Sequence, residues 1–187
     1  MKKSILVTGP VLSMSGYGYQ SRFALRALKS REDLFDIYIQ PLPWGKTGWI
    51  WENNKFRQWI DERITRTAVL ANQKQLQIDM TLQIGIPSEW RKVAPINIGY
   101  TAGIETTKVA PGWLQLGNEM DKILVVSNHA KTTYEKTVAM AMNQETQEKF
   151  EYRLNTPIEV VWERTDKAEI EEIEGIEFEN DFNFLLL

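Results

Sequence analysis

The sequence predicts an α/β protein built on a mostly parallel sheet with helices on both faces. Short apolar runs of strand length recur along the chain, several of them bounded by glycine or proline. Segments with helical spacing lie between these runs, an alternation that is typical of parallel sheets. Polar residues follow several of the runs, and we expect them to meet outside the carboxyl ends of the strands, where open α/β folds bind ligands.

The amino-terminal stretch predicts a strand, a glycine-containing loop and a helix in succession. Residues 4–8 form a short apolar run that is typical of a buried strand. We expect a loop over residues 9–18 and a helix over residues 19–29, where apolar residues recur at helical spacing. Glycines let the backbone approach a bulky anion, and the free N–H groups of a helix start point toward it. The loop therefore predicts an anion site, with a plain turn as the alternative.

A dinucleotide site is disfavoured in this loop, although Gly16 and Gly18 invite that interpretation. The dinucleotide fingerprint has a third glycine, and this chain has Ser21 at that position. An NAD site also has an acid at the end of the second strand, whereas the predicted strand over residues 34–40 ends in Gln40. The sequence therefore argues against an NAD-dependent reductase.

Residues 41–51 form a predicted loop that contains Trp44, Trp49 and Trp51. An exposed indole can stack on the apolar C–H face of a sugar ring. The same indoles can instead fill the core or a domain interface, and both interpretations stay open at this point. A long helix over residues 53–72 follows, with an apolar face that indicates core packing.

The middle of the chain predicts three more strands. Residues 76–86 alternate strictly between apolar and polar, which predicts a strand with one wetter face, possible at an edge of the sheet. Residues 95–101 and 122–126 predict the next two strands, with a short helix near residues 111–118 between them.

The last predicted elements begin at Ser127, a residue type that often caps helices. The helical spacing of Ala130, Tyr134, Val138 and Ala141 predicts a helix that continues at least to residue 141. We expect residues 143–155 to be helix or loop and residues 157–162 to form one more short strand.

Candidate binding residues follow the two strands over residues 95–101 and 122–126. They are Thr101, Glu105, Thr106, Ser127 and His129. Glu105 could bind hydroxyl groups or cap the following helix, and Ser127 and His129 could equally be capping or surface residues. One histidine and no cysteine leave only scattered carboxylates, so we expect no metal site.

The bulk composition predicts a globular protein with an acidic carboxyl-terminal segment. The chain has 187 residues, of which 43% are hydrophobic and 25% charged, which is near the globular average and argues against wholesale disorder. Residues 163–181 carry nine acidic and two basic residues, a charge of −7, which leaves +4 on the rest of a chain of net charge −3. That body lacks the dense basic stripe of a nucleic-acid binder. The absence of cysteine and of a long apolar run predicts a cytoplasmic protein with no transmembrane segment.

The order of several motifs resembles the N-terminal domain of GT-B glycosyltransferases, in the group 1 branch that retains anomeric configuration and uses nucleotide-sugar donors. The segments that carry the resemblance are Gly16-Tyr17-Gly18-Tyr19-Gln20-Ser21-Arg22, residues 100–107 with Pro111 and Trp113, residues 121–131, and the strand over residues 158–162. The resemblance extends to about Trp162. It implies a Rossmann-like domain over residues 1–162, an acidic linker over 163–181, and the start of a second, donor-binding domain at 182–187.

This resemblance also implies roles for the candidate residues. Gly16, Tyr17 and Gly18 would lie beside the donor diphosphate. The acceptor side would be formed by Trp44, Thr101, Glu105, Thr106, Ser127 and His129. The ligands would be a nucleotide-sugar and a carbohydrate or other hydroxyl acceptor, with no metal or other cofactor. The chain alone would not transfer sugar, and its exposed domain face would allow self-association. The alternative is a non-catalytic α/β domain that binds a sugar or a nucleotide.

Overall fold

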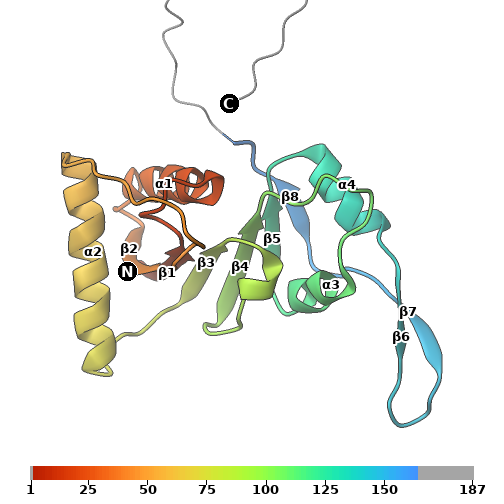
Figure 1. Cartoon of the computed structure of the whole chain (residues 1–187). Coiled ribbons are helices and arrows are strands. Elements are labelled where there is room, and N and C mark those ends of the chain that lie inside the picture. The colour runs from red at the N-terminus through yellow and green to blue at the C-terminus, as the bar shows by residue number, and fades with distance from the viewer. Residues whose placement is uncertain (1, 164–187) are drawn as a thin grey trace, which may run out of the picture.

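The computed structural model describes residues 2–163 as a six-stranded parallel sheet with four helices and one separate hairpin (Figure 1). The sheet contains β1 (Lys3–Gly9), β2 (Phe35–Pro41), β3 (Met80–Ile84), β4 (Ile96–Thr101), β5 (Lys122–Val125) and β8 (Ile158–Val160). The helices are α1 (Gly16–Lys29), α2 (Lys55–Asn72), α3 (Pro111–Asn118) and α4 (Asn128–Lys136), with a short 3-10 turn, η1 (Pro87–Glu89). The hairpin consists of β6 (Ala139–Met142) and β7 (Lys149–Tyr152). This architecture confirms the predicted α/β, Rossmann-like fold class.

The strand order β2-β1-β3-β4-β5-β8 reverses direction at β1. The chain steps from β1 to β2 on one side and then returns past β1 to build β3, β4, β5 and β8 on the other side, with every neighbouring pair parallel. In open α/β sheets a crevice forms where the strand order reverses, outside the carboxyl ends of the two strands. Here that point lies between β1 and β3.

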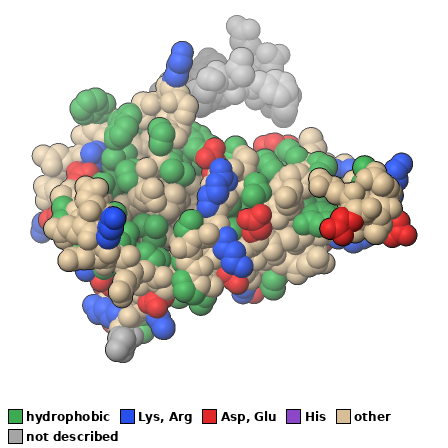
Figure 2. Space-filling model, turned by 90° about the horizontal axis from the view of Figure 1, so that it is seen from below, with side chains coloured by type: hydrophobic (Ala, Val, Ile, Leu, Met, Phe, Trp, Pro, Cys, Tyr) green, Lys and Arg blue, Asp and Glu red, His purple; other side chains and the backbone are tan. Residues whose placement is uncertain are grey.

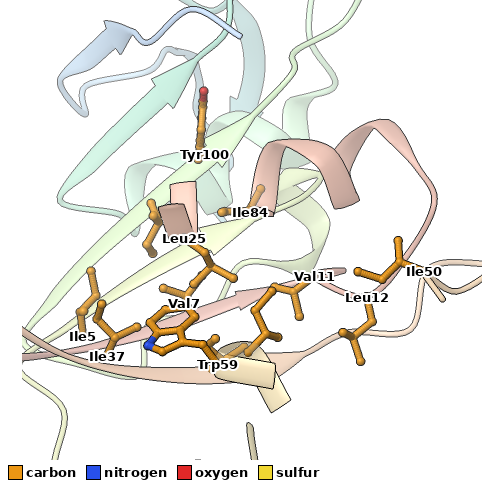
Figure 3. Close-up of a cluster of buried hydrophobic side chains, with 13 residues drawn as sticks. Ile5, Val7, Val11, Leu12, Leu25, Ile37, Ile50, Trp59, Ile84 and Tyr100 are labelled. Atoms are coloured by element: carbon orange, nitrogen blue, oxygen red, sulfur yellow. The ribbon is translucent and has the colours of Figure 1, made fainter. Parts of the chain in front are cut away.

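One face of the sheet, which we call the α1 face, is filled by aliphatic side chains. The strands contribute Ile5, Val7, Ile37, Ile39, Leu82 and Ile84, and the helices add Leu25 from α1 and Trp59 and Ile60 from α2. The parallel register places the strand residues side by side, for example Val7 opposite Ile39 and Leu82. Figure 3 shows Leu25 and Trp59 lying against the strand side chains of this cluster.

The opposite face, the α4 face, has a second apolar cluster toward β5 and β8. It contains Ile123, Val125 and Ile158 from the strands, Leu114 from α3, Ala130 and Tyr134 from α4, and Trp90 from the loop after β3. Trp90 lies flat against β4, where a Cβ on Gly99 would approach the indole to 2.6 Å. Only glycine leaves room for the ring at that position.

Helix α2 packs along the free edge of β2, and Figure 1 shows it standing at that end of the sheet. The Ile39 N–H of the edge strand donates to the Thr67 hydroxyl oxygen over 2.9 Å. On the α4 face, Arg66 donates two hydrogen bonds to Asp36, of 2.6 and 2.8 Å. The helix therefore satisfies a backbone donor that an edge strand would otherwise leave open.

Four predicted elements differ from the structure, beginning with α1 and β3. Helix α1 begins at Gly16 rather than near residue 19, because Ser15 caps it by accepting the Gly18 N–H. Strand β3 starts only at Met80 and lies inside the sheet between β1 and β4, so the suggested edge position is wrong. Its polar residues, Thr81 and Gln83, are buried. Their polar groups are satisfied there, because Gln83 donates to the Thr81 hydroxyl and also bonds to the backbone of Arg91.

The helix after Ser127 is the largest difference, because it stops at Lys136 instead of continuing to residue 141. The Thr137 hydroxyl bonds back to the Thr133 carbonyl and also accepts the Val109 N–H, which ties the chain to the loop before α3. Residues 139–152 then form the β6–β7 hairpin, which projects from the body in Figure 1, instead of helix or loop. The predicted linker and second domain, residues 163–181 and 182–187, lie outside the described residues apart from Glu163.

Candidate functional site

The amino end of α1 lies directly after the loop that follows β1, at the point where the strand order reverses. Ser15 accepts one first-turn N–H, from Gly18 at 3.1 Å, so the N–H groups of Gly16 and Tyr17 have no partner within residues 2–163. Gly16 is exposed, and nothing lies within 4 Å of the place where a Cβ would stand. These two N–H groups are therefore open to an anionic ligand.

The loop before α1 is held by a buried cation. The Arg22 guanidinium donates to the carbonyl oxygens of Val11 and Ser13, at 3.1 and 2.8 Å, and burial lowers the pKa of Arg22. Gly18 packs so closely that a Cβ would collide with the Ser13 carbonyl oxygen. Gly18 therefore serves the tight packing of the helix on its own loop, whereas Gly16 leaves the surface open.

Tyr17 connects α1 to the carboxyl end of β4. Its hydroxyl lies 2.9 Å from the hydroxyl of the buried Thr101 and accepts the Ala102 N–H over 3.2 Å. Its ring contacts the half-buried Trp44 at a centroid distance of 4.9 Å. Burial raises the pKa of Tyr17, and the charges of Glu163 and Glu105 raise it further. The phenol is therefore neutral at physiological pH and can both donate and accept a hydrogen bond.

The loops after β4 and β5 touch each other. Gly103 has a positive φ of 90°, and a Cβ there would lie 2.6 Å from the Ala130 Cβ in the first turn of α4. Ser127 caps α4 by accepting the Ala130 N–H over 3.1 Å. This capping role matches the alternative that the sequence left open for Ser127.

The other predicted residues line the outside of these loops. Glu105, Thr106 and His129 are exposed, and the Thr106 carbonyl accepts a 3.4 Å hydrogen bond from the Thr133 hydroxyl of α4. The cap residue of α3 is Ala110, so Glu105 does not cap that helix. Its carboxylate is close enough to raise the pKa of Tyr17, which makes it a neighbour of the site.

The structure thus brings the candidate residues together to different degrees. Gly16, Tyr17, Trp44 and Thr101 form one contiguous group: the Tyr17 side chain contacts Thr101 and Trp44, and Gly16 precedes Tyr17 in the first turn of α1. The remaining four flank this group along the loop after β4 and the start of α4: Glu105, Thr106, Ser127 and His129.

Sequence reasoning missed several polar groups buried behind this edge. The Tyr134 hydroxyl is buried without a hydrogen-bond partner among the described residues, and burial raises the pKa of Tyr134. The Gln20 amide is also buried near the Tyr100 hydroxyl, and neither its nitrogen nor its oxygen has a hydrogen-bond partner among the described residues. The Tyr100 hydroxyl instead donates to the Val161 carbonyl over 3.0 Å. Periodicity places such residues on an apolar helix face or in a strand and carries no signal of their hydroxyl or amide groups.

A separate hollow of about 590 Å³ lies at the junction of residues 48–53 and α2. None of its lining residues belongs to the Tyr17 group. We place the candidate site at the Tyr17 group and not in this hollow, because the former lies where the strand order reverses and has open backbone donors.

Among the described residues, surface charges of both signs are mixed (Figure 2), no helix could cross a membrane, and no metal-ligating side chains cluster. On the face shown in Figure 2, Lys and Arg side chains are interspersed with Asp and Glu and with hydrophobic side chains. No described helix has the length and apolar character that a membrane crossing requires. Within residues 2–163, no three His, Asp or Glu side chains gather closely enough to hold a metal ion. Comparison with protein-family models and with curated proteins found no match to the chain.

Proposed function

We propose that the chain is the acceptor-side domain of a nucleotide-sugar-dependent glycosyltransferase that transfers a hexose to a hydroxyl acceptor with retention of configuration. The observation that carries the proposal is the Tyr17 side chain, which joins the open amino end of α1 to Thr101 and Trp44 at the carboxyl edge of the sheet. The motif order of the sequence supports the same function. In such a protein the donor is held mainly by a second domain, so residues 2–163 would bind ligands without turnover.

The donor side of the proposed reaction uses the backbone. The unpartnered N–H groups of Gly16 and Tyr17 suit a diphosphate leaving group, because they stabilise negative charge as it develops on the departing oxygen. The loop that carries them is fixed by Arg22, so little reorganisation is needed when the charge appears.

The acceptor side of the proposed reaction uses side chains. The Trp44 ring is half-buried against Tyr17 and offers an apolar surface to a sugar ring. Glu105 is exposed beside the site and can accept hydrogen bonds from acceptor hydroxyl groups. A retaining transfer on one face of the donor needs no enzyme base, so Glu105 is assigned to binding.

Amide NMR of the ¹⁵N-labelled chain tests this proposal. We expect maltose and cellobiose to shift resonances of residues 101–107 and 127–129, and UDP-glucose or ADP-glucose to shift those of Gly16 and Tyr17. Tyr17→Phe removes the hydroxyl that holds Thr101 and should weaken both responses. Tyr38→Phe is the matched control, because among residues 2–163 the Tyr38 hydroxyl bonds only to Asp36 and Arg66, at the β2 edge.

The result decides between the two functions left open by the sequence. An absence of shifts in these loops with every sugar and nucleotide-sugar would contradict the proposal. A response to only one of the two ligand classes, the sugars or the nucleotide-sugars, would favour the alternative, a non-catalytic sugar- or nucleotide-binding domain.

A further inference from the structure

Two tryptophans in the segment between β2 and α2 point into solvent. Trp51 is 92% exposed and Trp49 is 57% exposed. Both lie outside the contiguous group around Tyr17, and neither takes part in the function proposed above. Tryptophan is on average a highly buried residue, so two exposed indoles in one short segment call for a physical reason.

The segment that carries them is fixed to the body of the protein. Ile50, between the two indoles, is buried, and its N–H donates to the Leu12 carbonyl over 2.9 Å. Figure 3 shows the Ile50 and Leu12 side chains next to each other at one end of the core cluster. Side chains alternate along an extended chain, so anchoring Ile50 inward directs Trp49 and Trp51 outward.

A second anchor comes from α2. Arg57 donates to the Ile50 carbonyl over 2.7 Å and to the Asp61 carboxylate over 2.9 Å. The Met14 N–H adds a 2.9 Å bond to the Gly48 carbonyl at the start of the segment. The indoles are therefore presented by an ordered loop, and binding of a ligand would cost little entropy to order them.

The exposed indoles border the hollow of about 590 Å³ described above, whose other lining groups are mainly hydrogen-bond acceptors. Glu52 and Asp61 contribute carboxylates, and Asn53 contributes an amide. Glu52 and Asn53 each accept one hydrogen bond, from Asn54 and Gln58, and a carboxylate or amide oxygen has a second lone pair for a further donor. The one cation of the lining, Arg57, is engaged by Asp61 and by the Ile50 carbonyl. The volume falls in the range of roughly 300–1,000 Å³ that small-molecule sites occupy.

We infer that this surface, formed by Trp49, Trp51, Glu52, Asn53 and Asp61, is a binding site for neutral oligosaccharides. A pyranose has an apolar C–H face that stacks on an indole and hydroxyl donors that match carboxylate and amide oxygens. Arg57 offsets the charge of Asp61, so Glu52 leaves the lining with a net negative charge, which disfavours phosphates and nucleic acids because they are anionic. The site is separate from the Tyr17 group and does not depend on the function proposed for that group.

Affinity electrophoresis of the folded chain in gels that contain soluble polysaccharide tests the inference. The probes are amylose, xylan, mixed-linkage β-glucan and hydroxyethyl cellulose, with tryptophan fluorescence during titration by the matching oligosaccharide. We expect at least one probe to retard the chain and Trp51→Ala to weaken binding about tenfold, since stacking area is lost. Phe150→Ala is the matched control, because Phe150 is a half-exposed aromatic on the distant hairpin.

Two variants distinguish binding at this surface from binding at the Tyr17 group. Binding that persists in Tyr17→Phe and disappears in Trp51→Ala assigns it to this surface, whatever the fate of the proposed transferase function. Failure of all four polysaccharides to retard the chain would overturn the inference, and so would retardation that Trp51→Ala leaves unchanged. Concentration-dependent dimerisation that Trp51→Ala abolishes, seen by analytical ultracentrifugation, would also overturn it, because the indoles would then serve self-association.

Discussion

The two faces of the sheet are filled by different chemistry. On the α1 face, the central positions of β1, β2 and β3 are all aliphatic and pack against Leu25 and Trp59. On the α4 face, β3 and β4 present the polar side chains of Thr81, Gln83 and Asn97, and all three are buried. One sheet is therefore stabilised in two ways. Hydrophobic contacts, which need no particular orientation, stabilise the α1 face, and hydrogen bonds, which do, stabilise the α4 face.

The polar side chains of the α4 face hold the loop between β3 and β4. The Asn97 side-chain oxygen accepts the N–H groups of Val93 and Ala94 and the Thr81 hydroxyl, over 3.0 to 3.2 Å. Gln83 exchanges two hydrogen bonds with the backbone of Arg91, of 2.6 and 2.8 Å. This face therefore fixes the position of a loop, whereas the α1 face mainly supplies burial.

Trp90→Ala should give the largest loss, because it removes the largest side chain of that loop, which is almost fully buried. The indole is buried over Gly99, so its removal leaves a cavity that the flat glycine surface cannot fill. We expect the free energy of unfolding to fall by about 3–5 kcal/mol, measured by urea denaturation. Trp51→Ala, an exposed tryptophan, should change it by less than about 0.5 kcal/mol. Equal effects of the two variants would contradict the packing described for Trp90.

Asn97→Leu tests the directional character of the α4 face at nearly constant volume. It leaves the Val93 and Ala94 N–H groups and the Thr81 hydroxyl without an acceptor, so we expect a loss of about 2–4 kcal/mol in the free energy of unfolding. The matched exchange on the α1 face, Leu25→Met, should cost less than about 1.5 kcal/mol. Similar losses for the two exchanges would remove the distinction between the faces.

Tyr134→Phe should act in the opposite direction. The Tyr134 hydroxyl packs in the apolar cluster of the α4 face with no partner among residues 2–163, and a buried unpaired hydroxyl destabilises the fold. We expect the variant to be more stable by about 1 kcal/mol in urea denaturation. Tyr100→Phe, which loses the bond to the Val161 carbonyl, should be less stable by a similar amount. A destabilised Tyr134→Phe would mean that the hydroxyl has a bound partner, such as a water.

The smallest expected effect concerns Asp36 at the β2 edge of the α4 face. Hydrogen bonds from Arg66 lower the pKa of Asp36 below its value in the unfolded chain, near 3.9. The pair therefore contributes stability above about pH 4 and loses it as the pH falls through the lowered pKa. Its side chains are 40% and 35% exposed, so we expect less than about 1 kcal/mol. Asp36→Asn should reduce the difference in unfolding free energy between pH 6 and pH 3 by that amount, and an unchanged difference would contradict it.

Much of the fold could be predicted because its signals are local. Helix α3 has the predicted bounds, since Pro111 fits the first turn of a helix and cannot continue a preceding one. Strands β1, β2, β4 and β5 were predicted to within a residue or two at each end, because each is an apolar run between polar or helix-breaking residues. Local signals failed for β6 and β7, where Val138 and Ala141 continue a helical spacing but strand pairing to residues 149–152 prevails.

The candidate site was predictable in place but not in detail. The rule that loops meet at the carboxyl edge of a parallel sheet brings the residues after β1 and β4 together. The hydrogen bond between the Tyr17 and Thr101 hydroxyls joins residues that are 84 positions apart. No local pattern in the sequence predicts such a pair. The same holds for the outward direction of Trp49 and Trp51, which follows from the anchoring of Ile50 on Leu12.

The covering of β2 by α2 gives the sheet a single end at which it can be lengthened. The Thr67 hydroxyl accepts the Ile39 N–H and donates to the Arg63 carbonyl, so an incoming strand would have to displace a helix to reach β2. At the other end, no described strand pairs with the outer side of β8. Any added strand, from this chain or another, should therefore pair with β8. Two chains that paired through β8 would form a dimer whose two outer edges are both covered by α2, so further strands could not add.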